Sequence, residues 1–125
     1  MKSEDCPFCN TGEEIIAENE LCFAMHDQYP ASPGHTLIIS RRHAKDFFDL
    51  NEDEKAACLD LLQVVKEILE KEHRPDGWNI GMNCGSIAGQ TAFHFHCHLI
   101  PRYKGDMEDP SGGVRHSVEG KGYYS

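Results

Sequence analysis

The run His94-Phe95-His96-Cys97-His98 alternates histidine with apolar residues. Side chains of a β-strand point to opposite faces in turn, and each residue advances the strand by about 3.3 Å. The three histidines are therefore predicted to share one face, at intervals of about 6.6 Å. The alternate positions are apolar and hold Phe93, Phe95, Cys97 and Leu99. This pattern is typical of a strand that packs one face into a core and lines a site with the other.

Three histidines on one face indicate a chemical site. Imidazole is the side chain whose pKa lies nearest neutrality, so such a row suits metal ligation or nucleophilic attack coupled to proton transfer. The alternative is that the three histidines are partly exposed and have no chemical function. The glycine-rich segment 85–91, just upstream, favours a site, because glycine lets the backbone approach an anion closely.

Length and charge limit the classes of protein to which the chain could belong. It has 125 residues, which predicts one domain over residues 1–125 with room for a real core. With 12 basic and 21 acidic residues the formal charge is −9, which disfavours a broad surface for nucleic acid or an anionic membrane. No window approaches the roughly eighteen apolar residues of a membrane span, and neither end reads as a secretory leader. The protein is therefore expected to be cytoplasmic.

The order of predicted elements gives an α+β fold with an antiparallel sheet. A helix is predicted over residues 52–73, because Asn51 suits an N-cap, Glu54 follows three residues later, and apolar residues recur at helical spacing. The segment Arg74-Pro75-Asp76-Gly77 should end it. Strands are predicted over 15–17 and 21–25 as a hairpin, over 36–40, over 78–83, over the histidine run, and over a short stretch around 114–118.

Two ordered blocks of sequence resemble a known family. The run Gly89-Gln90-Thr91-Ala92-Phe93-His94-Phe95-His96-Cys97-His98-Leu99-Ile100-Pro101-Arg102 resembles the signature of the histidine triad (HIT) superfamily of nucleotide hydrolases and transferases. The family's upstream hallmark is matched by Phe23 through Asp27, Pro30, Pro33-Gly34-His35-Thr36-Leu37-Ile38-Ile39 and His43. The resemblance implies a HIT-like antiparallel sheet of about five strands with one long and one short helix. It also implies a zinc-binding N-terminal segment, 1–14, and a C-terminal tail, 105–125.

The resemblance assigns the role of nucleophile to His96. A neutral imidazole can attack phosphorus and form a phosphoramidate that water later cleaves, which divides one hard displacement into two easier ones. For attack through one ring nitrogen, the other must carry the proton and donate it to an acceptor such as a main-chain carbonyl. His98, on the same face, could orient the phosphate or deliver a proton to the leaving group, and the resemblance supports contact with phosphate.

Several further residues are expected to contact the substrate. Negative charge that develops on the phosphoryl oxygens calls for fixed donors, which Gly89, Gln90 and Thr91 of the glycine-rich loop are predicted to supply. The resemblance places Asn83 near the phosphates. It places Asp27 at the ribose hydroxyls, where a carboxylate can accept two hydrogen bonds.

Other charged or titratable residues are expected to support the site. By family analogy, His35 supports the triad from a neighbouring strand. A polyphosphate substrate must meet local positive potential in this acidic chain. The available sources are Arg102, Lys104, Arg115, the histidines and main-chain amides. The alternative is that Lys104 and Arg115 are solvated surface residues with no role in the site.

The pair Cys6-Pro7-Phe8-Cys9 predicts a metal site. Cys-x-x-Cys supplies half of a tetrahedral zinc site. The resemblance supplies the other two ligands, His43 and His94, and implies a structural Zn²⁺. A glutaredoxin-like redox pair is the alternative, although such motifs follow a strand and open a helix, and two uncommitted thiols are another. The remaining cysteines are predicted to be small buried hydrophobic residues, namely Cys22, Cys58, Cys84 and Cys97.

The predicted function is that of a nucleotidyl hydrolase or transferase with a covalent nucleotidyl-His96 intermediate. Its substrate would be a dinucleoside polyphosphate, which the tail segment 110–115 favours by its resemblance to bacterial members, or a purine nucleoside phosphoramidate. Adenosine or guanosine phosphates are thus the expected ligands. A homodimer is also expected, because the helix 52–73 carries much apolar surface and the resemblance implies pairing through this helix and its neighbouring strand. The competing hypotheses are a metal-hydroxide hydrolase that uses His94, His96 and His98 as ligands, and a catalytically weak nucleotide-binding or zinc-stabilised interaction module.

Overall fold

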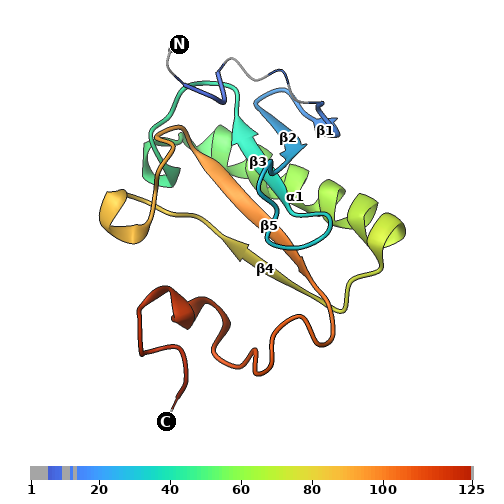
Figure 1. Cartoon of the computed structure of the whole chain (residues 1–125). Helices are drawn as coiled ribbons and strands as arrows, with labels where there is room; N and C mark the ends of the chain where they lie inside the picture. The colour runs from blue at the N-terminus through green and yellow to red at the C-terminus, as the bar shows by residue number, and fades with distance from the viewer. Residues whose placement is uncertain (1–5, 10–11, 13, 125) are drawn as a thin grey trace.

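The computed structural model describes residues 6–9, 12 and 14–124. Its centre is an antiparallel five-stranded sheet with the strand order β1-β2-β3-β5-β4 (Figure 1). The elements in chain order are β1 (Ala17–Glu18), β2 (Cys22–His26), β3 (Thr36–Ser40), η1 (Phe47–Asp49), α1 (Glu52–His73), β4 (Gly77–Gly81), η2 (Ser86–Ala88), β5 (His96–Arg102) and η3 (Gly113–Ser117). The predicted α+β fold is confirmed.

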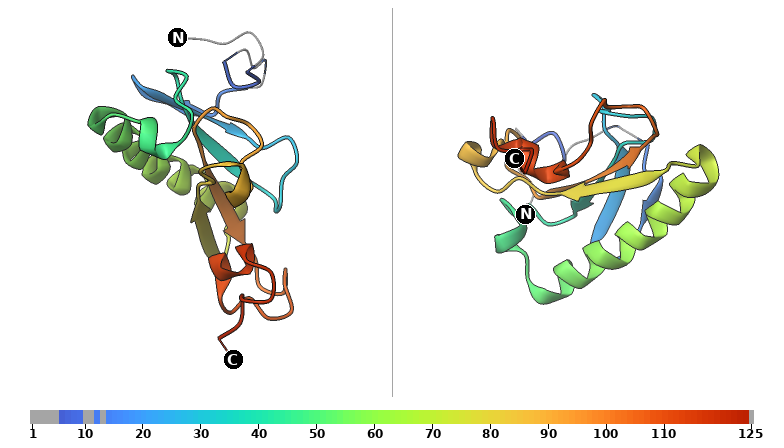
Figure 2. Two further views of the ribbon diagram at one scale, coloured as in Figure 1. Left: turned by 90° about the vertical axis from the view of Figure 1, so that its left-hand side faces the viewer. Right: turned by 90° about the horizontal axis from the view of Figure 1, so that it is seen from below.

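The long helix α1 covers one face of the sheet (Figure 2). Its start is fixed as the sequence predicted: the Asn51 side chain accepts from the Glu54 amide, and the Glu54 side chain accepts from the Asn51 amide. Its end is fixed by Arg74, which adopts a left-handed conformation with φ of 50°. The buried side of α1 packs on the inner face of the sheet through Cys58, Leu61, Val65, Leu69, Phe95, Cys97 and Leu99.

Strand β5 lies inside the sheet, between β3 and β4. Its residues alternate between partly exposed and buried, so that Cys97 and Leu99 face α1 whereas His96 and His98 face the opposite side. His98 is paired with Leu37 of β3 on one side and with Gly81 of β4 on the other. The sheet therefore holds the imidazoles of His96 and His98 on a rigid support away from the helix.

Several sequence predictions about local structure need correction. Strand β5 begins at His96, so His94 precedes it, and Phe93 is exposed rather than part of the core face. The expected strand around 114–118 is a 3₁₀-helix, η3, because Gly112 and Gly113 adopt positive φ angles that turn the chain. Glu18 is part of β1 rather than of the hairpin turn, and β4 ends at Gly81.

Cysteine burial agrees with prediction except at one position. Cys22, Cys58 and Cys97 are buried, and burial raises the pKa of the Cys22 thiol to about 12. Cys84 is partly exposed because it follows the end of β4 and begins the glycine-rich loop. None of the helices within the described residues has the length and apolar character needed to cross a membrane.

Candidate active site and metal centre

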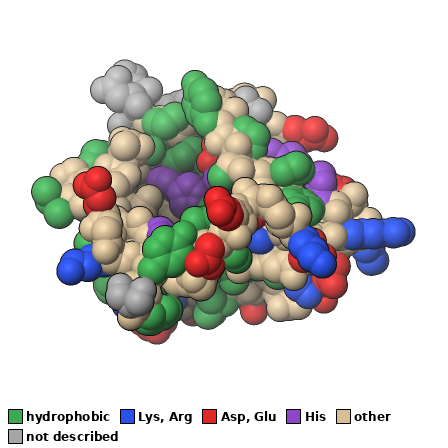
Figure 3. All heavy atoms as spheres, turned by 60° about the horizontal axis from the view of Figure 1, so that its bottom comes forward, with side chains coloured by type: hydrophobic (Ala, Val, Ile, Leu, Met, Phe, Trp, Pro, Cys, Tyr) green, Lys and Arg blue, Asp and Glu red, His purple; other side chains and the backbone are tan. Residues whose placement is uncertain are grey.

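A cleft of about 420 Å³ opens beside His96 and His98. Its walls come from three separate parts of the chain: the N-terminal turn, the strands β2 and β3 with the loop between them, and the glycine-rich loop. The lining residues include Pro7, Phe8, Met25, Asp27, Leu37, Asn83, Gly89, Thr91 and Ala92. Histidine side chains are visible in a hollow of the surface, with apolar side chains nearby (Figure 3). The fold thus brings together most of the residues predicted to contact substrate.

His96 has its tautomer set by the backbone. Its Nδ1 lies 2.8 Å from the carbonyl oxygen of His94, which can only accept, so Nδ1 carries the proton. The lone pair then resides on Nε2. An imidazole held this way presents a nucleophilic nitrogen, and the carbonyl stabilises positive charge that develops on the ring when that nitrogen forms a bond.

A chain of hydrogen bonds sets the tautomer of His98. The amide of Ala31 donates to Nδ1 of His35 over 2.9 Å, so the His35 proton is on Nε2. That Nε2 lies 2.9 Å from Nδ1 of His98 and donates to it. The proton of His98 is therefore on Nε2, where it is available to a phosphate oxygen or a leaving group. The hydrogen bond from Nε2 of His35 to Nδ1 of His98 is thus the contact through which His35 supports the triad.

Burial keeps His98 and His35 neutral. Desolvation is the main cause that lowers the pKa of His98, to about 4, and the neighbouring imidazoles of His96 and His35 act in the same direction. Desolvation also lowers the pKa of His35. The Asp27 carboxylate opposes both shifts, with Oδ2 3.5 Å from Nε2 of His35 and 4.0 Å from Nδ1 of His98. A neutral His98 matches the proton chain, in which Nδ1 must accept.

Gln90 lies in the glycine-rich loop, but its side chain bonds within the protein. It is only 3 % exposed, and its amide nitrogen donates to the carbonyl oxygens of Lys45 and Ala92 over 2.7 and 3.1 Å. Its side-chain oxygen accepts from the amide of Gly85 over 2.8 Å. Gln90 thus ties the start of the loop to the segment after β3, whereas Gly89 and Thr91 line the cleft.

The three cations predicted to attract phosphate lie outside the cleft. Arg102 is paired with the Asp106 carboxylate and the side-chain oxygen of Asn79. Arg115 stacks over Tyr124, with its guanidinium carbon 4.4 Å from the ring centroid. Lys104, like Arg102, lines a different hollow. The structure therefore places none of these three side chains in the lining of the cleft.

Beside the cleft, Cys6, Cys9, His43 and His94 form a group whose ligand atoms all lie within 4.8 Å of one another. Nδ1 of His94 is 3.1 Å from the Cys6 sulfur, 3.4 Å from the Cys9 sulfur and 3.2 Å from Nδ1 of His43. Tetrahedral zinc with bonds of about 2.0–2.3 Å separates its ligand atoms by about 3.3–3.8 Å. The spacing and the two sulfur and two nitrogen donors fit Zn²⁺. Residues 1–5, 10, 11 and 13 of the predicted zinc-binding segment fall outside the described residues.

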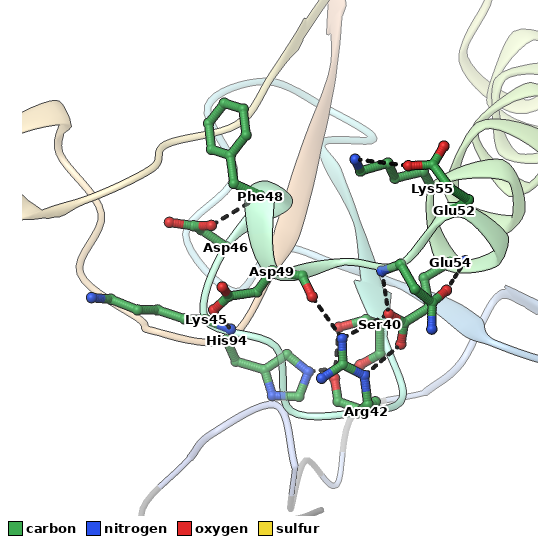
Figure 4. Close-up of polar contacts among 11 residues, drawn as sticks. Ser40, Arg42, Lys45, Asp46, Phe48, Asp49, Glu52, Glu54, Lys55 and His94 are labelled. Atoms are coloured by element: carbon green, nitrogen blue, oxygen red, sulfur yellow. Dashed lines mark hydrogen bonds and ion pairs between the residues drawn. The ribbon is translucent and has the colours of Figure 1, made fainter.

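The backbone also prepares His94 for a metal. Nε2 of His94 donates to the carbonyl oxygen of Ser40 over 2.6 Å, which leaves Nδ1 with its lone pair directed at the group (Figure 4). The loop that carries His43 is held in turn by Arg42, which bonds both carboxylate oxygens of Glu54 at the start of α1 (Figure 4). That bond lowers the pKa of Glu54 and keeps it ionised.

The N-terminal turn joins the metal group to the cleft. Between the two cysteines, Phe8 places its ring centroid 4.9 Å from that of His96 and 5.9 Å from that of His94. Pro7 and Phe8 both line the cleft. Sequence reasoning did not find this role for Phe8, because nothing in a Cys-x-x-Cys motif tells where its two middle side chains point.

The described residues separate the three histidines into different groups. His94 belongs to the cysteine-containing group, and His98 belongs to a second group with Asp27 and His35. His96 belongs to neither of them. This separation disfavours the hypothesis that the three histidines of the run hold one catalytic metal ion.

Comparison with known proteins shows the family of the chain. A model of the HIT domain matches residues 10–105. The chain belongs to the HIT domain family. An uncharacterized HIT-like protein of Saccharolobus solfataricus is 31 % identical over 124 residues, which cover 95 % of the chain and 89 % of that protein. Among solved structures, a Zn-bound histidine triad family protein of Mycobacterium smegmatis matches with a TM-score of 0.75 and 32 % identity, over 84 % of this HIT chain and 80 % of that one.

One named enzyme is also similar. An AP-4-A phosphorylase of Mycobacterium tuberculosis is 33 % identical over 93 residues, which cover 74 % of this HIT chain. Those residues cover 48 % of the phosphorylase, so the similarity spans about half of that enzyme.

Proposed function

We propose that this HIT protein cleaves a nucleotidyl group from a phosphoanhydride or a phosphoramidate through a covalent nucleotidyl-His96 intermediate. The observation that carries the proposal is the tautomer of His96. Its Nδ1 proton is donated to the His94 carbonyl, so Nε2 carries the lone pair for attack, and His96 lines a cleft large enough for a nucleoside. Family membership supports the same class of chemistry.

The residues of the cleft suit the two steps. In the first, Nε2 of His96 bonds to the α-phosphorus and the bond from phosphorus to the leaving group breaks, while the Nε2–H of His98 donates a hydrogen bond to the leaving atom. A phosphate leaving group departs as an anion, and an amine leaving group takes its proton from the solvent. In the second, water attacks the phosphorus, the bond to His96 breaks, and the proton of the water passes to the solvent. His98 is suited to the first step because the His35 bond fixes its orientation.

The remaining contacts follow from where each residue lies in the cleft. Asp27 is proposed to bind the ribose hydroxyls, since it lines the cleft and the Tyr29 amide, which donates to its Oδ1, fixes the carboxylate. Asn83, Gly89 and Thr91 are proposed to donate to the phosphate. For Gln90 we propose a different role from the predicted contact, that of holding the loop in shape.

A structural Zn²⁺ is proposed at Cys6, Cys9, His43 and His94. Four protein ligands complete a tetrahedral site and leave no position for water or substrate, so the metal would supply stability rather than a reactive hydroxide. A redox role for the two cysteines is less well supported, because each sulfur lies next to an imidazole nitrogen and all four ligand atoms lie within 4.8 Å of one another.

The proposed activity is tested by incubating the protein with adenosine 5′-phosphoramidate and, separately, with diadenosine polyphosphates, and by measuring the release of AMP. We expect AMP from at least one of these substrates, and unchanged turnover after brief treatment with a chelator that does not strip the zinc. Immediate loss of activity on chelation would favour a metal-hydroxide mechanism. Tight binding of AMP with no turnover of either substrate would show an interaction module instead.

A homodimer is proposed as the assembled form. Strand β4 lies at one end of the strand order, and Ile80 in it is 48 % exposed, while Leu59 and Val64 are exposed on α1. Pairing of two copies through α1 and the β4 edge would cover these apolar side chains. We expect light scattering at micromolar concentration to give twice the chain mass of 14.1 kDa. A particle of 14.1 kDa under those conditions would refute the dimer.

A further inference from the structure

Two side-chain hydroxyls hold the loop between β2 and β3 against the end of β5. Ser32 Oγ donates to the carbonyl oxygen of Pro101 over 2.6 Å. Tyr103 Oη donates to the carbonyl oxygen of Pro33, also over 2.6 Å. Neither Ser32 nor Tyr103 lines the cleft beside His96, and neither belongs to a group of ligand-forming side chains. The site described above therefore gives these two hydroxyls no role.

The part of the loop that the hydroxyls hold is a tight turn, Ser32-Pro33-Gly34-His35. The His35 amide donates to the Ser32 carbonyl oxygen over 3.1 Å, and Gly34 has a φ of 90°. Proline at the second position and a glycine with positive φ at the third are typical of a type II β-turn. Because proline also fixes its own φ, the turn is stiff. The turn and its two hydroxyl bonds therefore determine where the preceding residue, Ala31, presents its amide.

That amide acts on a pair of rings with two possible arrangements of protons. It donates to Nδ1 of His35 over 2.9 Å, and Nε2 of His35 lies 2.9 Å from Nδ1 of His98. One proton lies between the two rings, whichever ring carries it. The two arrangements therefore differ at the outer nitrogens, Nδ1 of His35 and Nε2 of His98. In one arrangement Nε2 of His98 carries a proton, and in the other it is bare.

The Asp27 carboxylate does not decide between the two arrangements. Its Oδ2 is 3.5 Å from Nε2 of His35 and 4.0 Å from Nδ1 of His98, the two nitrogens that share the inner proton. The carboxylate thus faces that proton in either arrangement. Among hydrogen bonds of the described residues, the one at an outer nitrogen comes from the Ala31 amide. It requires a lone pair on Nδ1 of His35, which leaves the proton of His98 on Nε2.

On the basis of the function proposed above, we propose that Ser32 and Tyr103 are positioning residues for the reaction. Their hydroxyls keep the Ala31 amide on Nδ1 of His35, so that His98 presents Nε2–H to the leaving atom. Without these bonds the loop moves away from His35, and the arrangement with a proton on Nδ1 of His35 becomes populated. His98 then offers a bare nitrogen where the leaving atom needs a donor, and the first step slows.

The part of the loop that lines the cleft is held separately from the turn. Asp27 directly follows β2, and its amide donates to the carbonyl oxygen of His35 over 3.0 Å. This bond continues the antiparallel pairing of β2 with β3. Loss of the two hydroxyl bonds should therefore lower kcat more than it raises KM, because the residue proposed to bind the ribose stays in place.

The test removes the hydroxyls in the full chain through Ser32→Ala, Tyr103→Phe and the double variant. NMR of ¹⁵N-labelled protein reads the tautomer, since protonated and bare ring nitrogens give separate signals. Wild type should carry the His98 proton on Nε2, and each variant should show a fraction with that proton on Nδ1. For adenosine 5′-phosphoramidate, kcat should fall by about twofold to tenfold per lost bond, the range for one hydrogen bond, with KM within about twofold.

Tyr123→Phe is the matched control, because the Tyr123 hydroxyl also donates to a backbone carbonyl oxygen, that of Asp109 in the tail, over 3.1 Å. It should change neither the ring nitrogens nor kcat. Ser32→Thr keeps a hydroxyl and should behave as wild type. A bare Nε2 of His98 in wild type, or ring nitrogens unchanged in all three test variants whatever their kcat, would overturn this inference while the nucleophilic role of His96 stands. No AMP from wild type would overturn the proposed function and, with it, the role of the two hydroxyls in the reaction.

Discussion

His96→Ala is expected to lower kcat by about 10³-fold to 10⁶-fold, the range seen when a bond-forming nucleophile is removed. The substitution removes the nitrogen that attacks phosphorus, while the proton chain from Ala31 through His35 to His98 remains. Zinc content and melting temperature should stay close to wild type, because His96 belongs to neither group of ligand-forming side chains. The measurements are AMP release under saturating phosphoramidate, elemental analysis and thermal unfolding.

His73→Ala is the matched control for this prediction. His73 is the last residue of α1 and does not line the cleft. Its replacement should leave kcat within about twofold, as expected of a surface substitution away from the site. Substantial activity in His96→Ala, with its fold and zinc intact, would show that another group attacks phosphorus.

Cys6→Ser is expected to have the largest effect on stability. Serine is a poor zinc ligand, so the variant should lose most of its zinc, and the group of buried donors loses the metal that holds it together. A loss of about 3 kcal/mol corresponds to a fall in Tm of about 10 °C or more for a domain of this size. Elemental analysis of protein purified without added metal, together with thermal unfolding, measures both effects.

The same variant should also bind nucleotide more weakly. The turn between the cysteines places Phe8 against His96 and lines the cleft, so a turn released from the metal no longer forms that wall. Isothermal titration with AMP measures this change. Cys84→Ser removes a partly exposed thiol outside the metal group and should change neither zinc content nor Tm. Sub-stoichiometric zinc in wild type, with an unchanged Tm in Cys6→Ser, would contradict a structural metal.

The sequence predicted the parts of the structure that depend on local patterns. The capping box at Asn51 and Glu54 and the helical spacing beyond it set α1 within the chain itself. Alternation along the histidine run predicted which side chains of β5 face outward. The metal group followed from one Cys-x-x-Cys pair and the family resemblance, and the fold brings its four members together.

Tertiary contacts decided the features that the sequence did not predict. Gln90 has the chemistry of a phosphate donor, yet the fold offers it the Lys45 carbonyl, and a buried amide must satisfy its donors. Arg102 has the charge to bind phosphate, but Asp106 lies within its reach and pairs with it. The tail is helical at η3 where a strand was predicted, because Gly112 and Gly113 adopt positive φ angles that turn the chain.

Capture of the covalent intermediate tests the central claim most directly. Wild-type protein is mixed with adenosine phosphoramidate labelled at the phosphorus, quenched rapidly without acid, and digested to locate the label. The account predicts label on His96 in a linkage that is labile to acid and stable to base, no label in His96→Ala, and overall retention of configuration at phosphorus. Absence of any adduct together with inversion at phosphorus would show a single direct displacement by water and would contradict the account.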